Sequence, residues 1–184
     1  MQAARGASLN SSDQSPLPGT RRPRVWLLFV AVAAVALAID ISTKQWALSA
    51  LDDRDIELLG DWFTLHLTFN PGSAFSTGPE FTMVFSVLAI VACLVVLWIS
   101  RRLANPLWAV ALGLLLGGVA GNLSDRLFRD PGVMHGHVVD FLMLPNWPVF
   151  NFADVFINVA AGLIILQSFR GIGVDGSRES EHDT

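Results

Sequence analysis

The sequence is poor in cysteine and in charged residues. Cys93 is the one cysteine among 184 residues, and Asp, Glu, Lys and Arg together make up only 15%. A single thiol cannot form a disulfide or a cysteine metal site within one chain. Because Cys93 lies inside an apolar run, we interpret it as a small buried hydrophobic residue. The chain also has no phosphate-binding glycine loop and no nucleophile elbow. It has no basic stripe suited to binding nucleic acid.

Apolar residues are abundant instead. They make up 52% of the chain and the mean hydropathy is +0.50, which is too high for an ordinary soluble domain of this size. A bilayer core of ~30 Å is crossed by about 20 mostly apolar residues in a helix. Four stretches approach that length, at 25–46, 81–100, 107–127 and 151–169. The sequence therefore predicts an all-α membrane protein with four transmembrane helices.

The basic residues are distributed unevenly around these stretches. Eight of the twelve lie before the first, between the second and third, or after the fourth: Arg5, Arg21, Arg22, Arg24, Arg101, Arg102, Arg170 and Arg178. Segment 51–80 carries six acidic residues against Arg54 alone. By the positive-inside rule, we expect both termini in the cytoplasm and segment 51–80 on the extracytoplasmic side.

Three regions follow from this distribution. Residues 1–23 and 171–184 lack apolar periodicity and are predicted to be disordered cytoplasmic tails. Residues 24–170 form the membrane domain. Within it, apolar and polar residues alternate from Trp62 to Phe69, which is typical of a strand, and Asn70, Pro71 and Gly72 turn the chain. We expect a small extracytoplasmic β-sheet around 56–76.

Polar residues occur where the membrane should not tolerate them. Asp40 and Lys44 are four residues apart on the first predicted helix, so they share a face and can form an ion pair. A direct contact with substrate is the alternative. Because these charges replace a small-residue cleavage site, we expect the first apolar stretch to be retained and not removed as a signal peptide.

The third predicted helix carries two patterns. Gly113, Gly117 and Gly121 recur every four residues, a small-residue stripe that allows close helix packing. Asn122 and Asp125 then share one face near the helix end. Charges solvated at a helix end are one interpretation of this pair. Groups that pair internally or face a wet cavity are the other, because an ionised group in hydrocarbon is costly.

The fourth predicted helix repeats the Asn and Asp pair with Asn151 and Asp154, and Asp140 lies in the loop before it. Converging carboxylates are costly unless they share a proton, hydrogen bonds or a cation. Aspartyl hydrolysis uses such a pair, in which one carboxylate activates water while its protonated partner polarises the carbonyl.

Three other interpretations compete with an aspartyl hydrolase. A metal site is disfavoured because His135 and His137 lie in a loop, with no Cys and no zinc helix motif nearby. A small proton- or ion-coupled transporter would use intramembrane carboxylates as a relay. Against it, these carboxylates gather at one interface and the chain has no internal repeat. A non-enzymatic assembly protein would not explain two Asn and Asp pairs.

Five short motifs occur in order along these spans. They are "DISTK" from Asp40, "FNPGSAF" from Phe69, "GNLSDRL" from Gly121, "VVDF" from Val138 and "FNFAD" from Phe150. Through them, the chain from 25 to 169 closely resembles the bacterial lipoprotein signal peptidase family, signal peptidase II.

The resemblance implies an intramembrane aspartyl endopeptidase. Such an enzyme would remove signal peptides from diacylglyceryl-modified prolipoproteins by cutting before the lipidated cysteine, and would use no metal and no cofactor. It would be a multi-pass protein of the bacterial cytoplasmic membrane with its active site near the extracytoplasmic face. We expect it to act as a monomer, with the prolipoprotein and membrane lipid as its partners.

The resemblance also assigns roles to individual positions. The catalytic aspartates of the family fall on Asp140 and Asp154. Its substrate-binding positions fall on Asn70, Asn122, Arg126 and Asn151. Its positions of structural support fall on Asp40, Lys44, Gly72, Ala74, Gly121, Asp125 and Ala153.

Residue chemistry alone does not rank Asp125 below Asp140, and that choice depends on the resemblance. From the residues, we interpret Asp125 as a partner of Arg126 or as a group that orients Asn122. The chain departs from the family in two places. The loop between Asp140 and Asp154 is short, and Val155 stands where a small hydroxyl residue is common.

Overall fold

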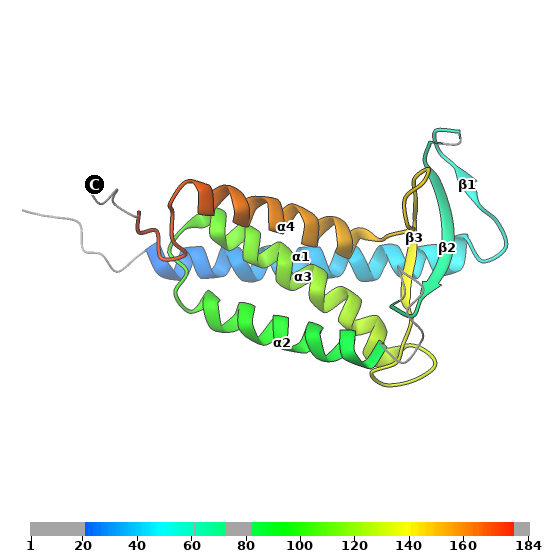
Figure 1. The fold of residues 1–184 in the computed structure, drawn as a ribbon, viewed down its shortest axis with the longest axis horizontal. Coiled ribbons are helices and arrows are strands. Elements are labelled where there is room, and N and C mark those ends of the chain that lie inside the picture. Colours follow the sequence, from blue (N-terminus) through cyan, green and yellow to red (C-terminus); the bar gives the residue numbers. More distant parts are fainter. Residues whose placement is uncertain (1–20, 61, 73–81, 179–184) are drawn as a thin grey trace, which may run out of the picture.

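The structure, a computed structural model, describes residues 21–60, 62–72 and 82–178. Four long helices form a bundle, and a small sheet lies across one end of it (Figure 1). The helices are α1 (Arg21–Ala50), α2 (Thr82–Ser100), α3 (Pro106–Phe128) and α4 (Phe152–Phe169). Each is long and apolar enough to cross a membrane, which confirms the four predicted transmembrane helices. Ala74 and residues 1–20 of the predicted N-terminal tail lie outside the described residues.

Helix α3 is the central helix, because it packs against α1, α2 and α4. Its glycines allow the close contacts. A Cβ atom added at Gly117 would lie 2.6 Å from the Cβ atom of Ala36 on α1. One added at Gly118 would lie 2.7 Å from the carbonyl oxygen of Ala153 on α4. The small-residue stripe predicted on this helix is therefore a packing surface.

The bundle is apolar on the outside and contains a polar interior. Many large apolar side chains are more than half exposed, among them Leu27, Val35, Leu88, Leu94 and Ile165. Asp40, Lys44 and Asn151, by contrast, are fully buried. Polar groups within a bilayer must find their partners inside the protein. This distribution is therefore the one expected of a protein with lipid around its helices.

The sheet has three antiparallel strands, β1 (Ile56–Glu57), β2 (Thr64–Asn70) and β3 (Val138–Met143), in the order β1-β2-β3. Strand β2 confirms the strand predicted at 62–69. In the register of β2 with β3, Thr68 lies opposite Asp140 and Asn70 lies opposite Val138. Asn70 and Asp140 therefore project from the same face of the sheet, because side chains two residues apart on a strand share a face.

Strand β3 was not predicted, because the sequence placed Asp140 in a loop. Residues 138–142 are all buried, so this strand is covered on both faces. A strand covered in this way lacks the alternation of polar and apolar residues that reveals a half-exposed strand. Its sequence, VVDFLM, accordingly gives no period of two.

An apolar cluster attaches the sheet to the end of α1. Ala47 and Leu51, at the end of that helix, pack with Leu65 of β2 and with Phe141 and Leu142 of β3. This contact determines where strand β3 lies relative to the helices, and therefore where Asp140 lies.

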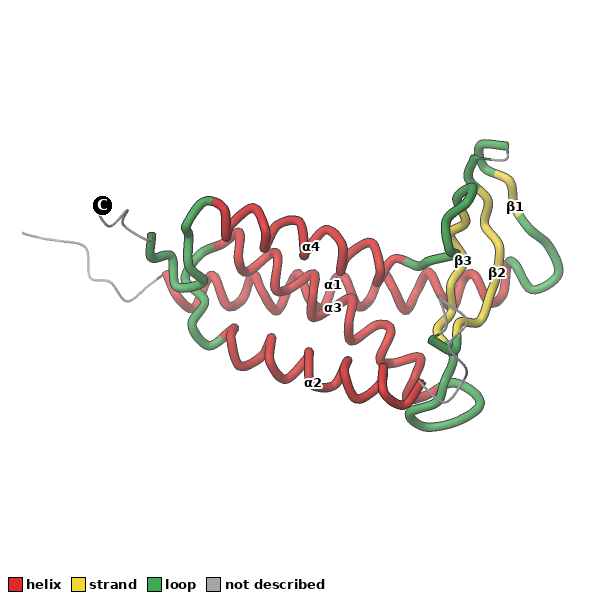
Figure 2. The backbone as a smooth tube through the Cα atoms, viewed as in Figure 1, coloured by secondary structure: helices red, strands yellow, loops and turns green. Residues whose placement is uncertain are grey.

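The other end of the bundle holds a short folded segment. The start of α1 and the end of α4 both lie at this end, away from the sheet (Figure 2). Beyond α4, the indole N–H of Trp108 donates to the carbonyl of Ile172 at 2.8 Å, and the N–H of Ala104 donates to the carbonyl of Val174 at 3.1 Å. Residues 171–178 lie within the predicted C-terminal tail, and these two hydrogen bonds attach them to the end of the bundle.

Candidate active site

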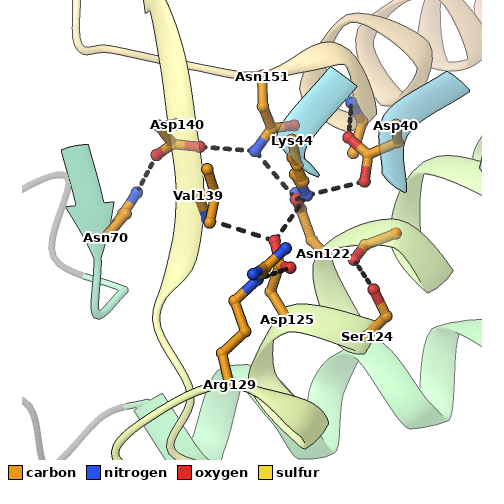
Figure 3. Close-up of polar contacts among 12 residues, drawn as sticks. Asp40, Lys44, Asn70, Asn122, Ser124, Asp125, Arg129, Val139, Asp140 and Asn151 are labelled. Atoms are coloured by element: carbon orange, nitrogen blue, oxygen red, sulfur yellow. Dashed lines mark hydrogen bonds and ion pairs between the residues drawn. The ribbon is translucent and has the colours of Figure 1, made fainter. Parts of the chain in front are cut away.

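Asn151 joins the two predicted catalytic aspartates. Asp140 lies on β3 and Asp154 lies in the first turn of α4. The Nδ2 atom of Asn151 donates to Oδ1 of Asp140 at 2.6 Å, a contact drawn in Figure 3. The backbone N–H of Asn151 donates to Oδ2 of Asp154 at 3.1 Å. One residue thus holds a carboxylate of the sheet and a carboxylate of the bundle.

The same residue begins helix α4. The Oδ1 atom of Asn151 accepts from the backbone N–H of Asp154 at 3.1 Å, which completes a reciprocal capping box. Such boxes satisfy backbone donors that a helix start leaves free. The spacing of Asn151 and Asp154 in the sequence, which predicted a shared helix face, therefore also produces the cap that fixes Asp154.

Asp140 is almost completely buried, with 2% of its surface exposed. Its second oxygen, Oδ2, accepts from Nδ2 of Asn70 at 2.9 Å. Burial raises the pKa of Asp140 to about 7, and the negative charge of Asp154 adds to this rise. The hydrogen bonds from Asn70 and Asn151 act in the opposite direction. A carboxyl group with this pKa can keep its proton near neutral pH.

Asn122 on α3 holds Asp154 from the other side. Its Nδ2 atom donates to Oδ1 of Asp154 at 2.9 Å. Its Oδ1 atom accepts from Nδ2 of Asn151 at 3.0 Å and from Nζ of Lys44 at 2.8 Å. The two amides and the two carboxylates thus form one hydrogen-bonded network.

Buried charges lie behind this network. Nζ of Lys44 lies 2.8 Å from Oδ2 of Asp40, which is the ion pair expected from their spacing. The same Nζ lies 2.9 Å from Oδ2 of Asp125. Oδ1 of Asp40 accepts from the backbone N–H of Ala153 at 2.9 Å, so this cluster also holds the start of α4. A Cβ atom at Gly121 would collide with the carboxylate of Asp40.

Asp125 has other partners than the sequence suggested. Its carboxylate contacts Lys44, pairs with Nε of Arg129, and accepts from the backbone N–H of Val139 at 3.3 Å. Arg126 and Asn122 are not among its hydrogen-bond partners in the described part of the chain. For Arg126 the reason is helical spacing, because residues four apart share a face and adjacent residues do not. That spacing could have identified Arg129 from the sequence.

Arg126 lies on α3 beside the site. In the described part of the chain, its Nη1 atom is buried without a hydrogen-bond partner. The guanidinium lies 5.6 Å from the centre of the Phe85 ring. At Gly72, an added Cβ atom would lie 3.6 Å from Nη1 of Arg126 and 2.8 Å from the Phe85 ring, and the φ angle of +108° also favours glycine. Gly72 thus lets the backbone approach the Phe85 ring closely beside this guanidinium.

The two aspartates lie in the wall of a cavity of about 780 Å³. The end of β2, residues 147–150 and the first two turns of α4 line it. Its lining includes Asn70 as well as Trp147 and Asn158, two residues that the sequence did not suggest. The volume lies within the usual range of ligand pockets. A substrate in this cavity would meet both carboxylates.

The structure brings most of the predicted site residues together. A connected set of hydrogen bonds and ion pairs links Asp40, Lys44, Asn70, Asn122, Asp125, Asp140, Asn151, Ala153 and Asp154. Gly121 and Gly72 give close approach at its edges. Within the described residues, His, Cys, Asp and Glu side chains form no group of three that could hold a metal ion.

A buried carboxylate and a half-buried one, joined by one asparagine at one end of a bundle of four membrane helices, define a membrane protein with a site of the aspartyl-protease type. The model of a protein family described as Signal peptidase (SPase) II matches residues 32–170. The chain belongs to this family, as its five motifs indicated, and is therefore a multi-pass membrane peptidase.

Proteins named lipoprotein signal peptidase are similar over most of the chain. The protein of Rhodococcus jostii (strain RHA1) is 44% identical over 170 residues, which cover 92% of this chain and 85% of that protein. The protein of Mycobacterium avium (strain 104) is 43% identical over 162 residues, covering 88% of this chain and 89% of that protein. That of Streptomyces griseus is 42% identical over 158 residues, covering 85% and 81%.

The fold is also similar to that of a solved bacterial membrane enzyme. Its structure, determined by the in meso method at 2.3 Å resolution, matches with a TM-score of 0.67 and 23% sequence identity, over 85% of this chain and 93% of that chain. This similarity confirms the predicted fold class of four membrane helices with a small sheet. None of these similarities supports the transporter alternative.

Proposed function

We propose that this chain removes signal peptides from diacylglyceryl-modified prolipoproteins by cutting before the lipidated cysteine. The observation that carries the proposal is the pair of Asp140 and Asp154, joined by Asn151 in the wall of one cavity. The five motifs and the family membership give the class of substrate.

The environments of the two carboxylates suggest their roles. Asp140, with a pKa of about 7, is the proton donor. Asp154 accepts hydrogen bonds from Asn122 and Asn151 and is the base. Water attacks the scissile carbonyl carbon while Asp154 takes one water proton and Asp140 gives its proton to the carbonyl oxygen. The tetrahedral gem-diol intermediate then collapses: the C–N bond breaks, the proton on Asp154 passes to the leaving amine, and one hydroxyl proton of the gem-diol returns to Asp140.

Three asparagines and an arginine would hold the substrate and the two carboxylates. Asn70, Asn122 and Asn151 each donate to a catalytic carboxylate, so they would keep the pair in place. Arg126 has the buried Nη1 donor and is the residue that we expect to bind a carbonyl group of the substrate.

The orientation in the membrane is also a proposal. Arg24, Arg101 and Arg170 lie at helix ends away from the sheet, and the positive-inside rule puts that end in the cytoplasm. The sheet and the cavity would then face the extracytoplasmic side of the bacterial cytoplasmic membrane. The apolar signal helix of the substrate would enter sideways from the bilayer, with its lipid chains left in the hydrocarbon. We expect the enzyme to work as a monomer without metal or cofactor.

A cleavage assay tests this proposal. Purified protein in nanodiscs is mixed with a diacylglyceryl-modified prolipoprotein in EDTA, and cleavage is followed as a gel shift. We expect wild type to cleave, and Asp140→Asn and Asp154→Asn to fold but not to cleave. The matched control is Asp52→Asn, which changes an exposed carboxylate of the sheet-side loop and should cleave like wild type. Absence of cleavage by folded wild type would overturn the proposal.

A further inference from the structure

We infer that Lys44 is a positioning residue for the catalytic pair, and that it acts by holding the side-chain amide of Asn122 in one orientation. This inference rests on the proposed function. It gives Lys44 a role in turnover in addition to the structural support that its ion pair provides.

The ammonium group of Lys44 contacts three polar side chains. A lysine ammonium has three donors and no acceptor. The Nζ atom of Lys44 donates a hydrogen bond to Oδ1 of Asn122 at 2.8 Å, and it forms ion pairs with Oδ2 of Asp40 at 2.8 Å and Oδ2 of Asp125 at 2.9 Å. Figure 3 shows the ammonium among these three side chains. Lys44 is fully buried, so no water competes for its donors.

The contact with Asn122 does more than neutralise charge. Asp125 already pairs with Arg129, so the cluster has two carboxylates and two cations and is balanced. Besides its two ion pairs, Lys44 donates a hydrogen bond to a neutral amide oxygen. That contact leaves the charge balance unchanged but determines which end of the amide faces Lys44.

The orientation of the Asn122 side-chain amide determines which of its atoms faces Asp154. With Oδ1 facing Lys44 and Asn151, the Nδ2 atom faces Asp154 and donates to it at 2.9 Å. The flipped amide would place its NH2 group against the ammonium of Lys44 and the NH2 group of Asn151. Its oxygen would face the carboxylate of Asp154. All three contacts would then become repulsive pairs of two donors or two acceptors.

The side-chain amide of Asn122 is also connected to the carboxylate of Asp140, through Asn151. Asn151 donates to Oδ1 of Asn122 at 3.0 Å and, through the same Nδ2 atom, to Oδ1 of Asp140 at 2.6 Å. Loss of the Lys44 contact therefore releases a group that is hydrogen-bonded to Asp154 directly and to Asp140 through Asn151. A small displacement of such a group lowers the rate of the chemical step more than substrate binding.

A charge-balanced substitution isolates this role. Lys44→Met alone would leave Asp40 buried without its cation, which is strongly destabilising. In an Asp40→Asn background, Lys44→Met removes one further charge and leaves the Asp125–Arg129 pair in place. The amide oxygen introduced at position 40 can still accept from the N–H of Ala153. Asp40→Asn alone is the reference, because it keeps the contact of Lys44 with Asn122.

The test is a double-mutant cycle with Asn122→Ala in this background. Single-turnover rates and KM are measured on the lipid-modified substrate, and folding is checked by gel filtration and thermal melting. We expect Lys44→Met to lower kcat about 10²-fold with KM changed less than threefold. With Asn122→Ala present, the same substitution should change kcat less than threefold, because its partner is already absent.

Three results would overturn the inference. The first is a fall in kcat of less than threefold on Lys44→Met, and the second is a rise in KM without a fall in kcat. The third is a fall in kcat of the same size with Asn122 and with Asn122→Ala, which would mean that Lys44 acts only through the fold. If the Lys44→Met protein does not fold, Asn122→Asp replaces it, since Asp keeps an oxygen on Lys44 but has no N–H for Asp154. Full activity of Asn122→Asp would also overturn the inference. Inactive folded wild type would instead refute the proposed function.

Discussion

Asn151 has two separable tasks, to begin helix α4 and to hold the catalytic carboxylates, and Asn151→Ala should damage both. Loss of an Asn cap costs about 0.5–2 kcal/mol. Loss of its Nδ2 donor leaves the buried Asp140 with one fewer partner, for about 1–3 kcal/mol more. Because 1 kcal/mol shifts Tm by about 2–4 °C in a chain of this size, we expect a fall of roughly 3–20 °C. Cleavage should fall by at least about 10²-fold.

Asn105→Ala is the matched control. Asn105 caps α3 at the other end of the bundle, where its Oδ1 atom accepts from the N–H groups of Leu107 and Trp108. Each kcal/mol of capping free energy that this variant loses should lower its Tm by about 2–4 °C. We expect it to cleave like wild type. A third variant, Asn151→Asp, keeps a good cap but removes the amide donor, so it should fold and fail to cleave.

Thermal melting in detergent and the gel-shift assay together decide the matter. Cleavage by Asn151→Ala within tenfold of wild type would refute the argument that Asn151 holds the carboxylates. Equal losses of cleavage in Asn151→Ala and Asn105→Ala would show that helix stability alone explains the effect.

Three further predictions concern pH, packing and the C-terminal segment. Because burial raises the pKa of Asp140 to about 7, kcat should fall about tenfold per unit at pH values well above 7, and a rate that rises from pH 7 to 9 would contradict its role as acid. The stability that the raised pKa of Asp140 contributes is present below the unfolded pKa of ~3.9 and lost as pH rises through about 7. The Tm of wild type should therefore decline more steeply over that range than the Tm of Asp140→Asn. Gly117→Val should cost about 1–3 kcal/mol, because the added Cβ atom meets α1, whereas Gly162→Ala, which has no atom within 4 Å of the added Cβ, should leave Tm equal or higher. Trp108→Phe removes the hydrogen bond to Ile172 and should speed proteolysis after α4 without changing cleavage of the prolipoprotein.

The helices and part of the site could be predicted because their signals are local. Length and apolar character identified all four helices. The four-residue spacing of Asp40 and Lys44 predicted their ion pair, and the glycine stripe predicted the close packing of α3. These features depend on residues within one helix, so the period of the helix is enough to find them.

The contacts between elements could not be predicted in this way. Lys44 and Asn122 are 78 residues apart and meet because of how α1 crosses α3. Strand β3 was missed because both its faces are buried. The helix brings Arg129, four residues on, to the carboxylate of Asp125, whereas the adjacent Arg126 that the sequence suggested lies on another face.

The division of the catalytic pair between sheet and bundle has a mechanical consequence. Asp140 moves with β3, and Asp154 moves with α4. Their spacing therefore reports how the sheet sits on the end of α1, where Leu51, Leu65 and Phe141 form the contact. Apolar residues that touch no substrate can thus tune the rate by tilting one carboxylate toward or away from the other. Sequence drift in that cluster would change turnover while every catalytic residue stayed the same.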